Sequence, residues 1–188
     1  MTALNLSDDS RRKLIRQLQG AYSGELAAGH AYRGHWRSLR NEAQRARVRQ
    51  IEAEEWHHRQ LVGNLLRDLG ARPNPVREVI LWLIGKAIGL FCLVGGWFAP
   101  MYGAGRLELV NIIEYQDAAA YALRCGHEEM IDCLLTMAEV EWEHERFFRN
   151  MVTGHWMLRI CPLWDEPQPK SAIRTRHEAL ENKPPAVA

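Results

Sequence analysis

Apolar residues recur at helical spacing along most of the chain, and alternating strand-like patterns are nearly absent. The pattern predicts four long helices, of which the first begins at Ser7 or Ser10 and runs to about Leu39. The others are expected over residues 42–69, 103–124 and 128–152, with Gly70 and Gly126 as breaks. We therefore expect an all-α protein built from two antiparallel helix pairs.

The apolar stripe of each expected helix is interrupted by acidic residues or by a glutamate and a histidine. In the second and fourth helices the interruption is a Glu-x-x-His pair, whose two side chains share one helix face. The stripes are Leu14, Leu18, Ala21, Glu25, Ala28, Tyr32; Val48, Ile51, Glu55, His58, Val62, Leu65, Leu69; Leu107, Val110, Glu114, Asp117, Tyr121; and Leu134, Met137, Glu141, His144, Phe148, Met151.

Residues equally distant from a tight turn lie side by side in an antiparallel pair. Glu25 and Glu55 are centred on residue 40, and Glu114 and Glu141 on the region beside Gly126. Each half of the chain thus brings two carboxylates and one imidazole to one level, and a long connection lets the halves meet.

Six buried ionisable groups would each cost several kcal/mol without compensation, which a pair of divalent cations would supply. The predicted metal ligands are Glu25, Glu55, His58, Glu114, Glu141 and His144. This donor set suits two iron ions, with manganese as the alternative. It is also the pattern of ferritin-like four-helix bundles, with one Glu from each of two helices and Glu-x-x-His from each of the others.

The sequence offers two other positions for ligands of the same site. Glu54-x-x-His57 overlaps the second-helix pair but lies on a more polar stripe, and Glu108 competes with Glu114. Asp117, Tyr121 and Tyr32 are candidates for residues that contact the ligands and orient them.

The stretch from Val79 to Gly105 carries only one charge, Lys86. Its glycines, Lys86 and Pro100 argue against a membrane span, so we expect a long apolar crossover helix that is buried or lies in a membrane surface. We assign residues 1–160 to one helical domain. Residues 161–188 form a loosely ordered C-terminal tail, with a short helix around residues 171–182.

Composition and charge restrict the classes of function that the chain can have. A net charge of +1 provides no strong electrostatic attraction to nucleic acid. The four cysteines lack metal-binding spacing, and the N-terminus lacks a secretion signal, which favours the cytoplasm. No dinucleotide-binding glycine motif follows a strand, so a reductant would have to be external.

The motifs resemble the demethoxyubiquinone hydroxylases of ubiquinone biosynthesis. The resemblance rests on "SGELAAGHAYRGH", "EEWHHRQL", "GLFCLVGGWFAPMYGAG", "EYQDAAAY" and "EVEWEHERF", and it covers about residues 10–152. The chain departs from the family at "YSGE", at Ala120 and at Asp117.

The resemblance implies a di-iron monooxygenase that uses O2 and an external reductant, with NADH as one candidate, to hydroxylate a prenylated quinol ring. Glu25 with His58 would serve one iron and Glu114 with His144 the other, with Glu55 and Glu141 bridging. Residues 79–105 would contact the inner face of the membrane, and a homo-oligomer is left open. The alternatives are a ferritin-like peroxidase or iron-handling protein, and a non-catalytic helper that binds prenyl lipids.

Overall fold

The computed structural model describes residues 3–181, with side chains for residues 7–179, and the regular elements of this part of the chain are all helices. The long helices are α1 (Ala3–Ser38), α2 (Glu42–Asp68), α3 (Pro75–Val94), α4 (Phe98–Arg124) and α5 (Ile131–Val152). A shorter helix, α6 (Ser171–Glu181), follows them, and two 3-10 segments lie at Glu128–Met130 and Trp156–Arg159. The predicted all-α class is confirmed.

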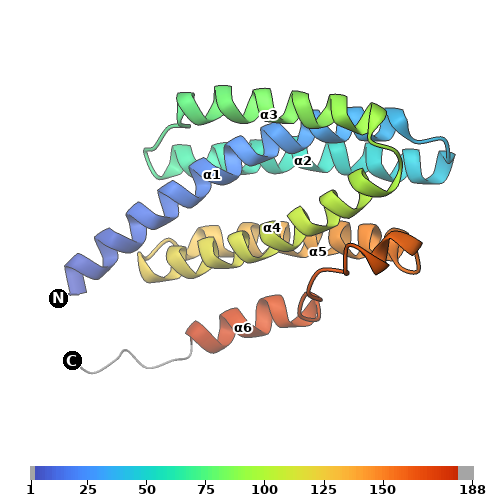
Figure 1. Cartoon of the computed structure of the whole chain (residues 1–188). Coiled ribbons are helices and arrows are strands. Elements are labelled where there is room, and N and C mark those ends of the chain that lie inside the picture. The colour runs from blue at the N-terminus through green and yellow to red at the C-terminus, as the bar shows by residue number, and fades with distance from the viewer. Residues whose placement is uncertain (1–2, 182–188) are drawn as a thin grey trace.

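Four of the long helices form a bundle in which α1 packs on α2, α4 packs on α5, and α1 also contacts α4 (Figure 1). The helix ends follow from local sequence. Asn41 caps α2 by accepting a hydrogen bond from the Gln44 backbone amide, and Gly70 and Gly126 have positive φ angles at the turns that follow α2 and α4. The turn at residues 39–41 joins α1 to α2, and the turn at Gly126 joins α4 to α5, so the two antiparallel hairpins that the sequence predicts are present. Gly70 ends α2 before the connection to α3.

The helix α3 connects the two hairpins and lies along α1 (Figure 1). Its buried positions, Gly85, Gly89 and Cys92, are small, and a Cβ atom on Gly34 would lie 2.0 Å from the Gly89 carbonyl oxygen. The glycines of α1 and α3 therefore permit close backbone contact, as their number in α1 suggests. No helix in residues 3–181 combines the length and apolar character needed to cross a membrane.

The outer face of α3 is apolar and exposed. Val79, Leu83, Leu90 and Val94 are 60%, 55%, 66% and 80% exposed. The segment expected to be a single crossover is divided at residues 95–97, after which α4 begins five residues before the expected start. The apolar face that the sequence predicts is thus directed outward from the bundle and not into a core.

The hydrophobic core has two halves. One contains Leu14, Leu18, Leu66 and Met137 together with other residues of α1, α2, α4 and α5, and the other contains Tyr32, Ile51, Met101 and Phe148 with their neighbours. Along each of the four bundle helices, buried polar side chains lie between the residues that belong to one half of the core and those that belong to the other.

The C-terminal segment packs on the bundle as far as the structure describes it. The backbone oxygens of Trp164 and Asp165 accept hydrogen bonds from Arg149, and Ile173 of α6 is buried in the core. The short helix expected around residues 171–182 is present as α6, and Arg149 and Ile173 supply contacts to this segment that composition does not reveal. Residues 182–188 of the expected tail lie outside the described residues.

Candidate metal centre

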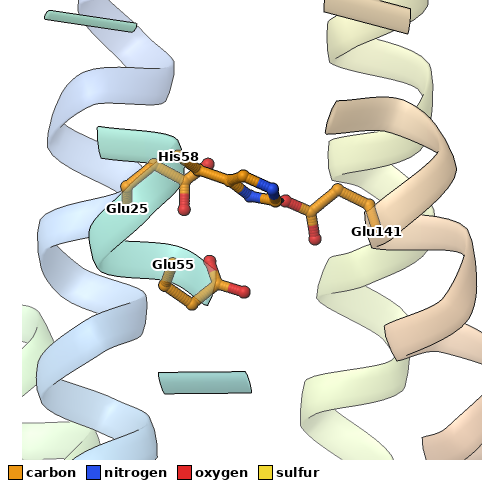
Figure 2. Close-up of side chains that lie close together, drawn as sticks. All are labelled: Glu25, Glu55, His58 and Glu141. Carbon is orange, nitrogen blue, oxygen red and sulfur yellow. The ribbon is translucent and has the colours of Figure 1, made fainter. Parts of the chain in front are cut away.

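Six buried side chains from four helices converge in the middle of the bundle. They are Glu25 of α1, Glu55 and His58 of α2, Glu108 of α4, and Glu141 and His144 of α5. Each is at most 3% exposed. In both Glu-x-x-His pairs the three-residue spacing directs the carboxylate and the imidazole to one helix face, and Figure 2 shows Glu25, Glu55, His58 and Glu141 pointing toward one another.

The six residues form two overlapping groups of four. One group comprises Glu25, Glu55, His58 and Glu141, and the other Glu55, Glu108, Glu141 and His144. Within each group one donor atom per residue lies within 4.8 Å of all the others. Glu55 and Glu141 belong to both groups, which is the sharing expected of two carboxylates that bridge a pair of ions.

The two imidazoles point the same type of nitrogen at the shared carboxylates. His58 Nδ1 lies 2.9 Å from Glu141 Oε1, and His144 Nδ1 lies 3.2 Å from Glu55 Oε1 and 3.3 Å from Glu141 Oε2. Although His58 Nδ1 and Glu141 Oε1 are close, their geometry is not that of a hydrogen bond, and both atoms lack a hydrogen-bond partner within the described chain. Both oxygens of Glu55 and Oε2 of Glu25 also lack one.

The structure does not bring Glu114 into this cluster, and Glu108 occupies the expected place. Glu108 and Tyr115 are seven residues apart, so they share a face of α4, and the Tyr115 hydroxyl donates to Glu25. Glu114 precedes Tyr115 by one residue and is therefore turned away by about 100°. Glu108 lies six residues before Glu114, about 9 Å along the axis of α4, so the position in the cluster differs from the expected one in both its level and its helix face.

The error arose because α4 is apolar on more than one face. Leu107 and Val110, which suggested the inward stripe, are 57% and 48% exposed. The buried stripe contains small residues, among them Ala104, Ala118 and Ala122, which give a weaker hydrophobic signal.

Burial dominates the electrostatics of the cluster. Burial and the charge of Glu55 raise the pKa of Glu25, and burial and the charge of Glu141 raise the pKa of Glu108, both well above the usual range. Burial, followed by the charge of Glu141, raises the pKa of Glu55 to about 7. Burial alone would raise the pKa of Glu141 as well, but the two imidazoles lower it. The other three carboxylates thus resist ionisation unless further positive charge is supplied.

Neighbouring side chains hold the cluster in place. The Tyr32 hydroxyl and Asn111 Nδ2 both donate to Glu108, the latter over 3.0 Å. His144 Nε2 lies 2.7 Å from Glu54 Oε2, which leaves Nδ1 directed at the cluster. Burial alone would raise the pKa of Glu54, but the hydrogen bonds and charges of His144 and Arg47 lower it to about 2.

The three residues expected to orient the ligands lie in different places relative to the cluster. Tyr32 contacts the cluster through Glu108. Asp117 is exposed and does not face inward, because it lies on the same outward face as Leu107 and Val110. Tyr121 packs against the apolar core beside α5 instead of the cluster.

Sequence reasoning missed Tyr115, Asn111 and the contact of Glu54. The seven-residue spacing of Glu108 and Tyr115 was the available signal for α4. Glu54 had appeared only as a ligand in an alternative register, and its pairing with a histidine from α5 depends on tertiary contact.

A cavity of about 440 Å³ lies between α1, α3 and α4 and reaches the cluster. Glu25, Glu108 and Tyr115 line one part of it, and most of its remaining wall is apolar. The other apolar or small lining residues include Gly24, Ala28, Ile84, Ile88, Gly103, Ala104 and Leu107. The buried carboxylates can therefore be reached by an apolar molecule.

Comparisons with known proteins agree with the resemblance carried by the motifs. No family model matches the sequence, and no solved structure matches it significantly. Over 92 residues the chain is 33% identical to proteins named 3-demethoxyubiquinol 3-hydroxylase from Bordetella parapertussis and Bordetella bronchiseptica. The match covers 48% of this chain and 40% of each relative, so it spans less than half the length of either protein. The chain is thus similar over about half its length to 3-demethoxyubiquinol 3-hydroxylases, which supports the suspected family assignment.

Proposed function

We propose that this protein is a di-metal hydroxylase that inserts one oxygen atom from O2 into a prenylated quinol ring at a membrane surface. The observation that carries the proposal is the opening of a buried four-carboxylate, two-histidine cluster into an apolar cavity. The relatives, whose name describes hydroxylation of 3-demethoxyubiquinol, support the choice of ring.

The donor set fits two metal ions. Five buried atoms of Glu25, Glu55, His58 and Glu141 lack hydrogen-bond partners among the described residues, which is unusual in a protein interior and is explained if cations occupy the space between them. We assign Glu25 and His58 to one ion, Glu108 and His144 to the other, and Glu55 and Glu141 to both. This is the ferritin-like arrangement, with iron preferred and manganese as the alternative.

When bound and reduced by an external donor, for which NADH is one candidate, such a metal pair supplies the activation of O2. The chain positions the ligands and excludes water. Tyr115 and Tyr32 hold Glu25 and Glu108, and Glu54 fixes the orientation of His144 so that Nδ1 faces the cluster.

The shape and chemistry of the cavity support a ring with a hydrocarbon tail. Ile84, Ile88 and Leu107 line the cavity and are also 43%, 37% and 57% exposed, so the apolar wall continues to the surface. The exposed apolar face of α3 adjoins this opening and suits contact with lipid. We therefore place the protein at the inner face of the membrane as a peripheral protein, with residues 79–105 in contact with lipid.

A peroxidase or iron-handling role would use the same cluster without the cavity, and a non-catalytic lipid-binding helper would use the cavity without the cluster. The test is to add O2 to the reduced, metal-loaded protein with a prenylated demethoxyquinol and to follow the ring product by mass spectrometry. We expect a product heavier by one oxygen atom.

A matched pair of variants controls this assay. His144→Ala should lose the product, because one metal would lose its only nitrogen ligand, whereas Glu143→Ala on the exposed side of the same helix should retain it. An unmodified ring together with rapid consumption of hydrogen peroxide would favour the peroxidase. An unmodified ring that binds tightly to a protein lacking metal would favour the helper.

A further inference from the structure

The imidazole of His35 lines the cavity but takes no part in the hydrogen bonds around the metal cluster. His35 follows Glu25 by ten residues on α1 and is only 2% exposed. Its ring stacks with those of Tyr32 and Phe148, at centroid distances of 6.3 and 5.9 Å and interplanar angles of 19° and 17°. The ring is therefore held in one plane by its neighbours.

The Nε2 atom of His35 is buried and has no hydrogen-bond partner within the described chain. Four other polar residues of the same lining bond to one another in pairs, Tyr115 with Glu25 and Asn111 with Glu108, and the unpaired oxygen of Glu25 belongs to the metal cluster. Buried polar atoms in native proteins are nearly always paired, so an unpaired one beside a cavity indicates a partner that enters with a ligand.

Burial lowers the pKa of His35 to about 4, so the ring is neutral near pH 7. A neutral imidazole has one nitrogen that donates and one that accepts a hydrogen bond. It can therefore bond either to a ring hydroxyl or to a ring carbonyl without introducing a charge into an apolar cavity.

We propose that His35 is a specificity-determining residue that hydrogen-bonds an oxygen substituent on the ring of the molecule held in the cavity. The class of that molecule, a prenylated oxygenated ring, rests on the proposed function. Apolar walls alone discriminate weakly between rings of similar shape. A buried polar group disfavours the binding of a ring that lacks the matching oxygen, because the polar group would then remain unpaired.

The experiment measures binding of two probes to the purified, metal-loaded protein. The probes are a prenylated hydroquinone and a prenylated benzene with the same tail and no ring oxygens. The variants are His35→Phe, which keeps a stacked aromatic ring, and His35→Gln, which keeps a group able to form hydrogen bonds. Dissociation constants for both probes are compared in each protein.

We expect the wild-type protein to prefer the hydroquinone, and His35→Phe to reduce that preference by about 3- to 10-fold, the effect of one net hydrogen bond. Affinity for the prenylated benzene should stay the same, which also reports an intact cavity, and His35→Gln should recover part of the preference. Because His35→Phe removes an unpaired buried nitrogen, its Tm should be equal to or above that of the wild type.

The outcomes separate the two proposals. If His35→Phe and His35→Gln keep the wild-type preference, or weaken both probes equally, the role of His35 is overturned and the proposed function stands. If the wild-type protein binds neither probe, the proposed function is overturned and the role of His35 with it.

Discussion

At the residue scale, the site depends both on which way a side chain faces and on where it lies along its helix. The structure brings together both Glu-x-x-His pairs that the sequence predicts, because Glu55, His58, Glu141 and His144 interrupt strongly apolar stripes. Their role as metal ligands stays a prediction. Helix α4 lacks such a stripe, and the position that it contributes to the cluster differs from the expected one by six residues. The side chains of Glu108 and Glu114 differ in burial and in partners, so they can be distinguished by experiment.

The first prediction distinguishes these two glutamates. Glu108→Ala should lose most of the bound metal, because it removes a ligand whose carboxylate lies within 4.8 Å of Glu55, Glu141 and His144 donors. Glu114→Ala should retain wild-type metal content, since Glu114 lines the outer part of the cavity. The measurement is metal analysis of both proteins purified in parallel. If Glu114→Ala loses metal and Glu108→Ala does not, Glu114 is the ligand, as the sequence predicts.

The second prediction concerns the pH dependence of stability at His35. Its pKa is lowered from 6.5 to about 4, so between these values the unfolded chain binds a proton that the folded protein does not. Stability therefore rises with pH across this window and is lost as pH falls through it, by an amount on the order of 3 kcal/mol in full.

His35→Phe removes this contribution. Urea unfolding at pH 7 and near pH 4.5 should show that the variant gains stability relative to the wild type at the lower pH. Both proteins share all other titrating groups, so the difference between their pH profiles isolates His35. Parallel profiles would show that the imidazole is accessible to protons in the folded state.

At the element scale, glycines of one helix have opposite roles. A Cβ atom on Gly34 would collide with the backbone of α3, whereas a Cβ atom on Gly24 would meet no atom within 4 Å and would project where the cavity is lined. The same helix thus uses one glycine to approach α3 and another to keep space open beside Glu25. The number of glycines in α1 does not by itself distinguish these two roles.

The third prediction uses this contrast. Gly24→Leu should weaken binding of a prenylated hydroquinone by filling the cavity, while stability stays equal or rises by up to about 1 kcal/mol because leucine favours helix more than glycine. Gly34→Ala should instead destabilise the protein by about 1–3 kcal/mol through overpacking against Gly89.

Urea unfolding and probe binding together measure both effects. Ala53→Leu, which adds the same side chain to an exposed position of α2, serves as the control and should leave binding unchanged. Unchanged binding in Gly24→Leu would mean that the ligand does not occupy this cavity.

At the scale of the whole molecule, the apolar surface is concentrated on the connection between the two hairpins. On α3 the small residues face α1 and the large apolar residues face outward, which reverses the usual arrangement of a surface helix. Such a surface favours contact with an apolar phase.

The fourth prediction tests that contact. Purified protein should float with phosphatidylcholine vesicles, and the double substitution Leu83→Gln and Leu90→Gln should reduce the floating fraction without changing Tm, because both residues are exposed. Ala43→Gln and Ala53→Gln on the exposed side of α2 form the matched control. Absence of the wild-type protein from the floating fraction would remove the membrane from the proposed function.

The sequence by itself determined the helical class, the extents of α2 and α5 to within three residues, and both Glu-x-x-His pairs. These properties follow from local periodicity, from turn glycines and from the high cost of placing charge on an apolar stripe. Only the tertiary structure decided the rotation of α4, the selection of Glu108, the contacts of Tyr115 and Glu54, and the cavity beside His35. Each of these depends on how one helix faces another. The sequence of α4, which packs against α1, α5 and α6, does not indicate which neighbour covers which of its faces.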